Sequence, residues 1–159
     1  MILVLLGTQD KPFNRLLEAI SKAKKNKVIK DKVVAQIGCT TFEDENIDTF
    51  DFKSKEEIEK LIDKARIVIT HAGVGTITEC LQRNKKVIVV PRLKKYGEHT
   101  NDHQLQITKE FAMKKYVLPL YDVKKLNKVL NDIKNFTPLK YKSNTENFKN
   151  KIKEYIDNL

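Results

Sequence analysis

The sequence predicts an α/β fold, with one parallel sheet of about six strands and helices on both faces. Six short apolar runs recur along the 159 residues, and several are unbroken β-branched stretches. Strands that are covered on both faces have this pattern, whereas strands with one solvated face alternate. Between the runs, apolar residues recur every three or four positions, as they do in amphipathic helices. Strands that alternate with helices in this way form parallel sheets through right-handed crossovers.

The predicted elements follow one another along the chain. The strands are the runs 2–6, 33–37, 47–52, 67–70, 86–90 and 116–120. One helix follows the first run, with Pro12 near its first turn and an apolar stripe at Phe13, Leu16, Leu17 and Ile20. Another begins at the capping pair Ser54 and Glu57, and its stripe is Ile58, Leu61 and Ile62.

No repeat, linker or low-complexity tract divides the chain, so we expect one domain over residues 1–159, with C-terminal helices over about 122–159. These comprise a helix over 123–133, a break at Pro138, and a charged amphipathic helix with Phe148, Ile152, Tyr155 and Ile156. The last helix either packs back across the sheet or offers a docking surface to a partner.

The composition is that of a soluble globular protein, with 40% hydrophobic and 33% charged residues. No apolar run approaches the roughly 20 residues of a membrane span. The run 2–6 is too short for a signal peptide and lacks a basic leader and a cleavage site. We therefore expect a cytoplasmic protein, in which Cys39 and Cys80 are buried free thiols rather than disulfide or zinc ligands.

The formal net charge of +10 raises the question of an anionic partner. Lysines are interleaved with acids, and only the last forty or so residues are persistently rich in lysine and asparagine. No aromatic and basic signature of an RNA-recognition module is present. The charge indicates a solvated surface that also favours anionic lipid headgroups, and we expect no nucleic-acid partner.

The segment 67–79 carries the strongest indication of a ligand site. A β-branched run breaks into the turn Gly73-Val74-Gly75 and then into a helix start. Backbone N–H groups at such a helix start are unpaired and bind anions such as a diphosphate. The turn is not a dinucleotide fingerprint, because it does not follow the first strand and has Thr78 where a third glycine is required. The lysine of a P-loop is also missing.

Glu79 has two interpretations. Thr76 and Glu79 lie three residues apart, as in a capping box, in which Glu79 would bond the first N–H groups of the helix. Alternatively, its carboxylate accepts hydrogen bonds from a ribose diol while the turn holds phosphates.

Polar residues follow other predicted strands. His99 and His103 would share a helix face, but a third ligand is missing and we predict no metal site. Asn101, Asp102 and Gln104 suit sugar hydroxyls, although Thr100 or Asn101 could simply cap the helix. His71 is interpreted as positioning the turn rather than as an acid or base. No nucleophilic triad is apparent.

Three motifs occur in order: His71-Ala72-Gly73-x-Gly75-Thr76-x-x-Glu79, Val90-Pro91-Arg92, and Gly97-Glu98-His99-x-Asn101-Asp102-His103-Gln104. Together they resemble the nucleotide-sugar-binding, Rossmann-like half of GT-B glycosyltransferases of the family 28 type. The chain is similar to the small Alg13-like group, which includes PssE- and EpsF-type subunits of bacterial polysaccharide synthesis. The likeness runs from Gly7-Thr8 to about residue 120.

The resemblance implies a UDP-sugar donor and a set of donor-binding residues. The diphosphate would meet Gly73, Val74, Gly75 and Thr76, and the ribose would meet Glu79. The donor sugar would face Asn101, Asp102, His103 and Gln104, with Gln104 in direct contact. Gly7 and Thr8 would close over the phosphate and sugar, and His71 would lie near the donor. Arg92 and His99 are possible contacts, and Arg92 or the pair Lys94-Lys95 could favour an acidic sugar.

The resemblance also implies an inverting hexosyltransferase with no cofactor and no essential metal. Helix-end N–H groups would stabilise the leaving UDP. The base for the acceptor hydroxyl would lie on an Alg14- or PssD-like membrane-anchored subunit, which recruits this chain to the inner membrane face for a polyprenyl-diphosphate-linked acceptor. The sequence specifies neither the sugar nor the acceptor. One alternative is a non-catalytic enhancer that stabilises such a partner, and a lower one is a basic nucleic-acid-binding domain.

Overall fold

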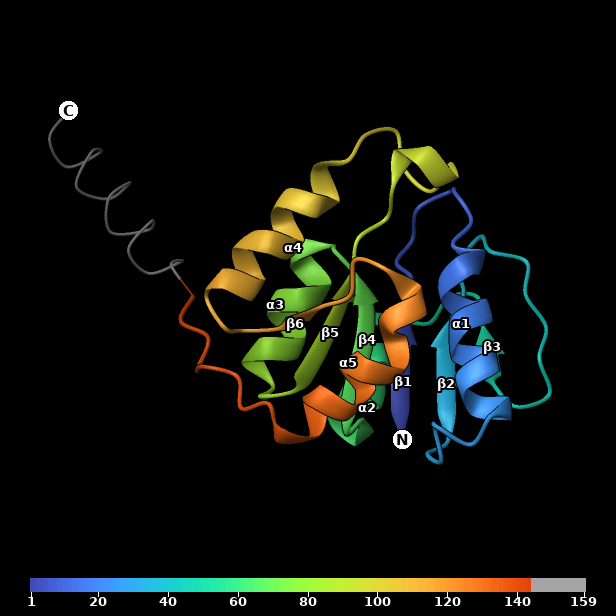
Figure 1. Cartoon of the computed structure of the whole chain (residues 1–159), viewed down its shortest axis with the longest axis horizontal. Coiled ribbons are helices and arrows are strands. Elements are labelled where there is room, and N and C mark those ends of the chain that lie inside the picture. Colours follow the sequence, from blue (N-terminus) through green and yellow to red (C-terminus); the bar gives the residue numbers. More distant parts are fainter. Residues whose placement is uncertain (144–159) are drawn as a thin grey trace, which may run out of the picture.

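The computed structural model describes residues 1–143, which form a six-stranded parallel sheet with helices on both faces (Figure 1). The strands lie in the order β3-β2-β1-β4-β5-β6 and all neighbouring pairs are parallel. Their bounds are β1 Ile2–Leu5, β2 Val33–Gln36, β3 Asp48–Phe50, β4 Ile67–His71, β5 Lys86–Val90 and β6 Leu118–Pro119. The predicted α/β class, the six strands and their parallel arrangement are confirmed.

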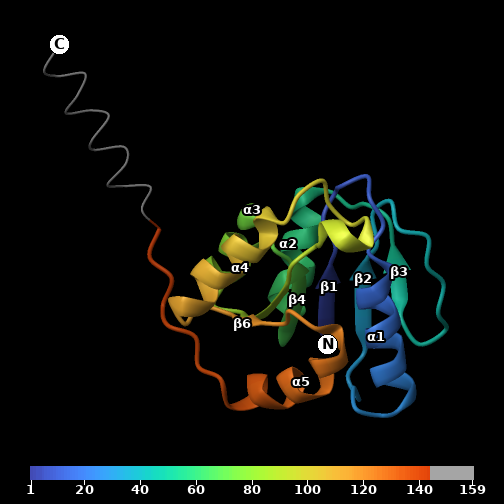
Figure 2. The ribbon, with the colours of Figure 1, turned by 45° about the horizontal axis from the view of Figure 1, so that its top comes forward.

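The helices divide between the two faces of the sheet (Figure 2). One face packs against α1 (Asn14–Lys25) and α5 (Leu126–Asn135), and the other against α2 (Lys55–Lys64), α3 (Val74–Gln82) and α4 (His103–Met113). Two short 3₁₀ helices, η1 (Lys94–Tyr96) and η2 (Val123–Lys125), complete the described elements.

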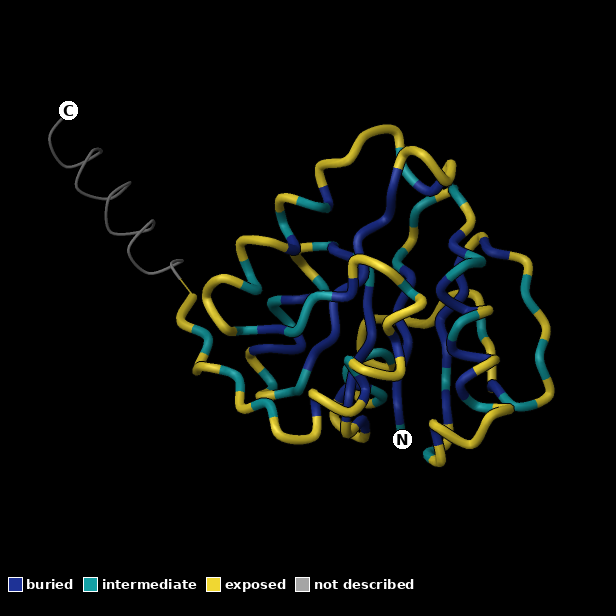
Figure 3. Tube along the Cα trace, viewed as in Figure 1, coloured by how far each residue is buried: buried dark blue, intermediate teal, exposed yellow. Residues whose placement is uncertain are grey.

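The strand β1 shows why continuous apolar runs become central strands. Ile2 and Val4 belong to the apolar cluster under α1 and α5, whereas Leu3 and Leu5 belong to the cluster under α2 and α3. Successive side chains of a strand point to opposite faces, so a strand covered on both faces has to be apolar at every position. Figure 3 shows this buried centre within an exposed outer surface.

The connection between β2 and β3 differs from the expected alternation, because residues 37–47 form no helix. Gly38 starts this loop with a φ of 56°, a conformation that glycine adopts readily. Asp44 then accepts a hydrogen bond from Ser21 Oγ, which holds the loop against α1, and one from the N–H of Asn46 within the loop. These bonds, with that of Ser21 first, lower the pKa of Asp44 to about 2.

Other local expectations had mixed outcomes. Ser54 and Glu57 form the predicted capping box of α2. Cys80 is buried, and burial raises its pKa to about 12. Cys39 is exposed, so the prediction that both thiols are buried was wrong for this residue.

The C-terminal region is described only in part. The helical pattern expected over 123–133 corresponds to η2 and α5. The predicted last helix, with its stripe from Phe148 to Ile156, lies outside the described residues. Within residues 1–143, no helix is long and apolar enough to cross a membrane.

Candidate functional site

The order of the strands locates the candidate site between the carboxyl ends of β1 and β4. From β1 the chain passes to α1 on one face, and from β4 it passes to α3 on the other. Such a reversal opens a crevice at the carboxyl edge of the sheet, where open α/β sheets bind their ligands. Gly7 follows β1 and the glycine turn follows β4, so both predicted motifs lie at the carboxyl edge of the sheet, beside this switch point.

The ring of His71 is packed between two glycines. A Cβ atom added to Gly7 would lie 2.6 Å from Cε1 of His71, and one added to Gly73 would lie 2.9 Å from the same atom. Gly7 also has a φ of 79°, which other residues rarely adopt. Both glycines are therefore required for His71 to occupy its position, whether or not a ligand is bound.

His71 is a neutral residue at neutral pH. Burial lowers its pKa to about 4, and the nearby Arg92 and His99 act in the same direction, against the hydrogen bond to Leu5. His71 Nδ1 lies 3.3 Å from the carbonyl oxygen of Leu5 and donates to it in the tautomer that this contact favours. Its Nε2 is then an acceptor without positive charge, which fits the predicted positioning role.

The glycine turn leaves the amino end of α3 open. Gly73 is the N-cap residue and supplies no side-chain cap, and its carbonyl oxygen accepts from the N–H of Ile77. The N–H groups of Val74, Gly75 and Thr76 have no acceptor among the described residues. A Cβ atom at Gly75 would meet nothing within 4 Å. Three unpaired donors at the positive end of a helix form a site suited to a phosphate group.

Glu79 is not part of a capping box. Because α3 begins at Val74, Thr76 lies inside the helix and Glu79 lies in its second turn. The capping interpretation was therefore wrong. The Glu79 carboxylate is partly exposed and lies 3.9 Å from Arg83 Nε, while Arg83 makes shorter ion pairs with Asp63 and Glu59. Glu79 thus remains available to a ligand.

Gln104 joins two strand exits through backbone contacts. Its side chain is buried, with 6% of the residue exposed, and its Oε1 accepts from the N–H groups of Ala72 at 3.1 Å and Arg92 at 3.0 Å. The oxygen is therefore engaged within the protein, and only the Nε2 group is left to meet a sugar. The expected direct contact between Gln104 and a sugar can therefore use only the N–H groups of its Nε2.

The segment 99–103 forms an exposed rim held by local hydrogen bonds. Asn101 donates its N–H to His99 Nδ1, and its Oδ1 accepts from the N–H of His103, whereas Asp102 is the N-cap residue of α4 and supplies no side-chain cap. Asp102 Oδ1 accepts from the N–H of Lys94 at 2.8 Å. Within residues 1–143, no three His, Cys, Asp or Glu side chains gather as a metal site would require.

Arg92 is a buried structural residue. Only 1% of it is exposed, and its guanidinium donates to the carbonyl oxygens of Leu6 and Lys11, each at 2.8 Å. Its Nε is the one side-chain polar atom of the described residues that is buried without a partner, and the group stacks 4.8 Å from the Phe13 ring. The suggestion that Arg92 favours an acidic sugar is therefore corrected, because the guanidinium is directed at the protein's own backbone.

Three residues at this edge were missed as site components. Glu98 is buried and forms a two-pronged ion pair with Arg15 at 2.7 and 3.0 Å, and Arg15 also donates to the carbonyl oxygen of Pro91. These contacts fix the loop after β5, but Arg15 and Glu98 lie 83 positions apart and share no local pattern. Phe52 was placed inside the predicted strand 47–52, but β3 ends at Phe50, and Phe52 lies beyond it with 53% of its surface exposed.

A doubly wound parallel sheet with a glycine turn at its switch point defines a Rossmann-like α/β domain. Comparison with known families identifies the particular class. The model of the glycosyltransferase family 28 C-terminal domain matches residues 1–159, and the chain belongs to this family.

The curated relatives include the transferase subunit of the same name from two organisms. The chain is 32% identical over 95 residues to the UDP-N-acetylglucosamine transferase subunit ALG13 of Candida albicans, a match that covers 60% of this chain and 31% of that protein. It is 30% identical over 105 residues to the subunit of the same name from Candida glabrata, a match that covers 64% of this chain and 48% of that protein. The matched region thus spans less than half of either relative.

Solved structures share the fold at lower identity. The NMR solution structure of ALG13 superposes with a TM-score of 0.62 at 19% identity, over 91% of each chain. The crystal structure of Acinetobacter baumannii MurG superposes with a TM-score of 0.56 at 19% identity, over 83% of this chain and 41% of that one. The predicted fold, that of the donor-binding half of a GT-B glycosyltransferase, is confirmed.

Proposed function

We propose that this chain is the UDP-sugar-binding subunit of a heteromeric inverting glycosyltransferase, and that its donor is UDP-N-acetylglucosamine. The observation that carries the proposal is the open turn Gly73–Thr76 at the switch point of a family 28 domain. The choice of sugar follows the ALG13 relatives, which are named as UDP-N-acetylglucosamine transferase subunits.

In this proposal the nucleotide lies along the carboxyl edge of the sheet. The N–H groups of Val74, Gly75 and Thr76 bind the diphosphate, and the partly exposed Glu79 carboxylate, held only by a long ion pair with Arg83, accepts from the ribose hydroxyls. The exposed ring of Phe52 offers a flat apolar face on which uracil can stack. The sugar meets Gln104 Nε2 and the rim at Asn101–His103, with Gly7 and Thr8 on the opposite side.

The chemistry assigned to this chain is stabilisation of the leaving group. An acceptor hydroxyl oxygen attacks the anomeric carbon, the bond from that carbon to the UDP oxygen breaks, and the acceptor proton passes to a base. Negative charge then grows on the diphosphate, where fixed N–H donors and the helix dipole lower the barrier. His71 adds no positive charge there, because its pKa of about 4 leaves it neutral.

The base, the acceptor site and the membrane location are assigned to a second subunit. The curated relatives are named as subunits, which supports a partner. We propose that this partner is Alg14- or PssD-like and membrane-anchored, and that it holds a polyprenyl-diphosphate-linked acceptor at the cytoplasmic membrane face. The metal independence proposed for the complex predicts unchanged transfer in the presence of a chelator.

Calorimetric titration of the purified chain with UDP, UDP-N-acetylglucosamine and ADP tests donor binding. We expect saturable binding of both uridine nucleotides, weaker binding of ADP, and at least a tenfold loss of UDP affinity in Glu79→Ala. The ion pair of Glu79 with Arg83 is partly exposed and long, so this substitution should change folding stability by less than about 0.5 kcal/mol. Equal binding of UDP and ADP would contradict the proposal.

Reconstitution with the membrane subunit separates donor binding from an enhancer role. Transfer that falls in parallel with UDP affinity in Glu79→Ala places the donor site on this chain. Full transfer by the partner together with a Glu79→Ala chain that no longer binds UDP would instead establish the non-catalytic enhancer.

A further inference from the structure

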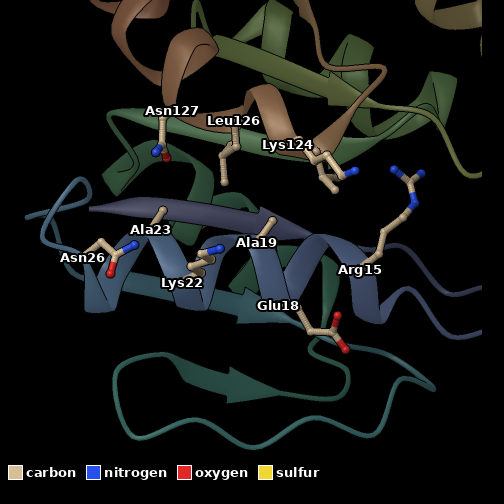
Figure 4. A pocket seen from close by; sticks show the side chains of 10 residues that line it. Arg15, Glu18, Ala19, Lys22, Ala23, Asn26, Lys124, Leu126 and Asn127 are labelled. Carbon is tan, nitrogen blue, oxygen red and sulfur yellow. The ribbon is translucent and has the colours of Figure 1, made fainter.

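A groove lies between α1 and the start of α5, away from the glycine turn (Figure 4). It has a volume of about 380 Å³ and runs between the two helices. Its apolar floor comes from Ala19 and Ala23 on α1 and from Leu126 on α5. The alanines lie four apart and leave open a space that larger side chains would fill.

The rim of this groove carries positive charge that the described residues do not neutralise. Lys22 on α1 and Lys124 on η2 line the groove, and neither forms an ion pair with a carboxylate among residues 1–143. By contrast, Lys25 pairs with Asp44 and Lys128 pairs with Asp132. Within the described residues, the start of α5 adds no free donors to this charge, because it continues from η2, where Asp122 accepts the N–H of Lys124 through Oδ1 and that of Lys125 through its carbonyl oxygen.

The one acidic side chain of the lining does not offset this charge. In Figure 4 the carboxylate of Glu18 is directed away from α5, whereas Ala19, Ala23 and Leu126 are directed into the space between the helices. The groove thus combines an apolar floor with two unpaired cations.

From these observations we infer that the groove of α1 and α5 is a docking surface for an acidic, amphipathic segment of a partner protein. Carboxylates of the segment meet Lys22 and Lys124, and its apolar side chains fill the space over Ala19 and Ala23. The net charge of +10 favours an acidic partner. A concave channel between helices accepts a polypeptide segment, whereas a flat bilayer surface would not reach its floor.

This surface suits the partner subunit, and to that extent the inference rests on the proposed function. One end of the groove is lined by Arg15, whose guanidinium bonds Glu98 and Pro91 of the loop after β5. A segment bound in the groove therefore lies beside the loop that borders the donor site. The same subunit could then reach the crevice with its acceptor.

The test is NMR titration of the full ¹⁵N-labelled chain with a synthetic amphipathic helical peptide of leucine and glutamate. We expect saturable shifts at the amides of Ala19, Ala23 and Leu126, and none of that size with a peptide in which lysine replaces glutamate. The variant with Lys22→Glu and Lys124→Glu should bind the acidic peptide about tenfold more weakly, since two attractive pairs become repulsive. The matched control, Lys30→Glu with Lys140→Glu, changes net charge equally outside the groove and should bind as the wild type does.

Several outcomes would overturn the inference. One is the absence of shifts at the groove with the acidic peptide, and another is an equal loss of binding in the control variant. Binding of phosphatidylglycerol vesicles or inorganic phosphate that depends on Lys22 and Lys124, without peptide binding, would assign the groove to a lipid or a small anion. Nuclear Overhauser contacts in the free chain between Leu126 and residues 144–159 would assign it to the chain's own C-terminal segment.

A UDP titration of the same samples keeps the two proposals separate. The charge-reversal variant should retain wild-type UDP affinity, because neither lysine lies at the glycine turn. Failure of the wild type to bind UDP would count against the proposed function, while the peptide result would still decide the role of the groove.

Discussion

The glycine turn allows a sharp comparison of two substitutions that each add one methyl group. In Gly73→Ala, the new Cβ atom would lie 2.9 Å from Cε1 of His71, a distance that real Cβ contacts do not show. In Gly75→Ala, the new Cβ atom would meet nothing within 4 Å. The two substitutions should therefore change stability in opposite directions, although they lie two positions apart.

The magnitudes follow from the local geometry. Gly73 has φ −84° and ψ 118°, which alanine adopts freely, so the cost comes from the His71 ring. Overpacking of this kind costs about 1–3 kcal/mol, and the lower entropy of the unfolded alanine chain returns about 0.4–1 kcal/mol. We expect Gly73→Ala to lower the free energy of unfolding by about 1–2 kcal/mol. Gly75→Ala lies inside α3 and should raise it by about 0.5–1 kcal/mol.

Urea unfolding of both variants measures these differences. A second variant tests the cause, since His71→Ala removes the ring that Gly73→Ala would strike. The double variant should therefore be more stable than the sum of the two single effects predicts. A Gly73→Ala protein as stable as the wild type, or strictly additive effects, would refute the steric argument.

Three further predictions concern buried groups. Folding lowers the pKa of His71 from 6.5 to about 4, so its contribution to stability is complete above pH 6.5 and is lost as the pH falls toward 4. In urea unfolding, the loss of stability should approach about 3 kcal/mol. The pH dependence that wild type shows and His71→Asn lacks is the part that comes from His71. Arg92→Leu leaves the carbonyl oxygens of Leu6 and Lys11 without their donor. The substitution should therefore lower the free energy of unfolding by about 3 kcal/mol. An unchanged midpoint in urea unfolding would contradict this. An aromatic disulfide reagent should react with Cys39 alone in the native protein, and with both Cys39 and Cys80 after denaturation. Rapid reaction of both thiols in the native protein would contradict the burial of Cys80.

Much of the fold could be predicted because its signals are local. The continuous apolar run of β1 indicated a strand covered on both faces, and Ser54 with Glu57 marked the start of α2. The glycine turn after β4 was also visible, since glycines between a β-branched run and a helix start are typical of a strand-to-helix turn. The helix-free loop 37–47 was missed because its order depends on Asp44 contacts with α1.

The candidate site was less predictable because long-range contacts decide which polar groups are free. Arg92 was considered as a contact to the donor sugar, yet its guanidinium bonds a carbonyl oxygen 86 residues away. Gln104 was predicted as a sugar ligand, yet its oxygen accepts from an N–H group 32 residues away. The spacing of Thr76 and Glu79 satisfied a capping rule, but the helix begins two residues before Thr76, so the rule did not apply.

The most direct test of a donor site at this turn is NMR titration of the ¹⁵N-labelled chain with UDP. The account predicts saturable shifts that are largest at the amides of Val74, Gly75 and Thr76, whose N–H groups have no acceptor among the described residues. Inorganic phosphate should shift the same amides at higher concentration, and ADP should do so with lower affinity than UDP. Saturable UDP binding that leaves these three amides unshifted, or the absence of UDP binding, would contradict the account.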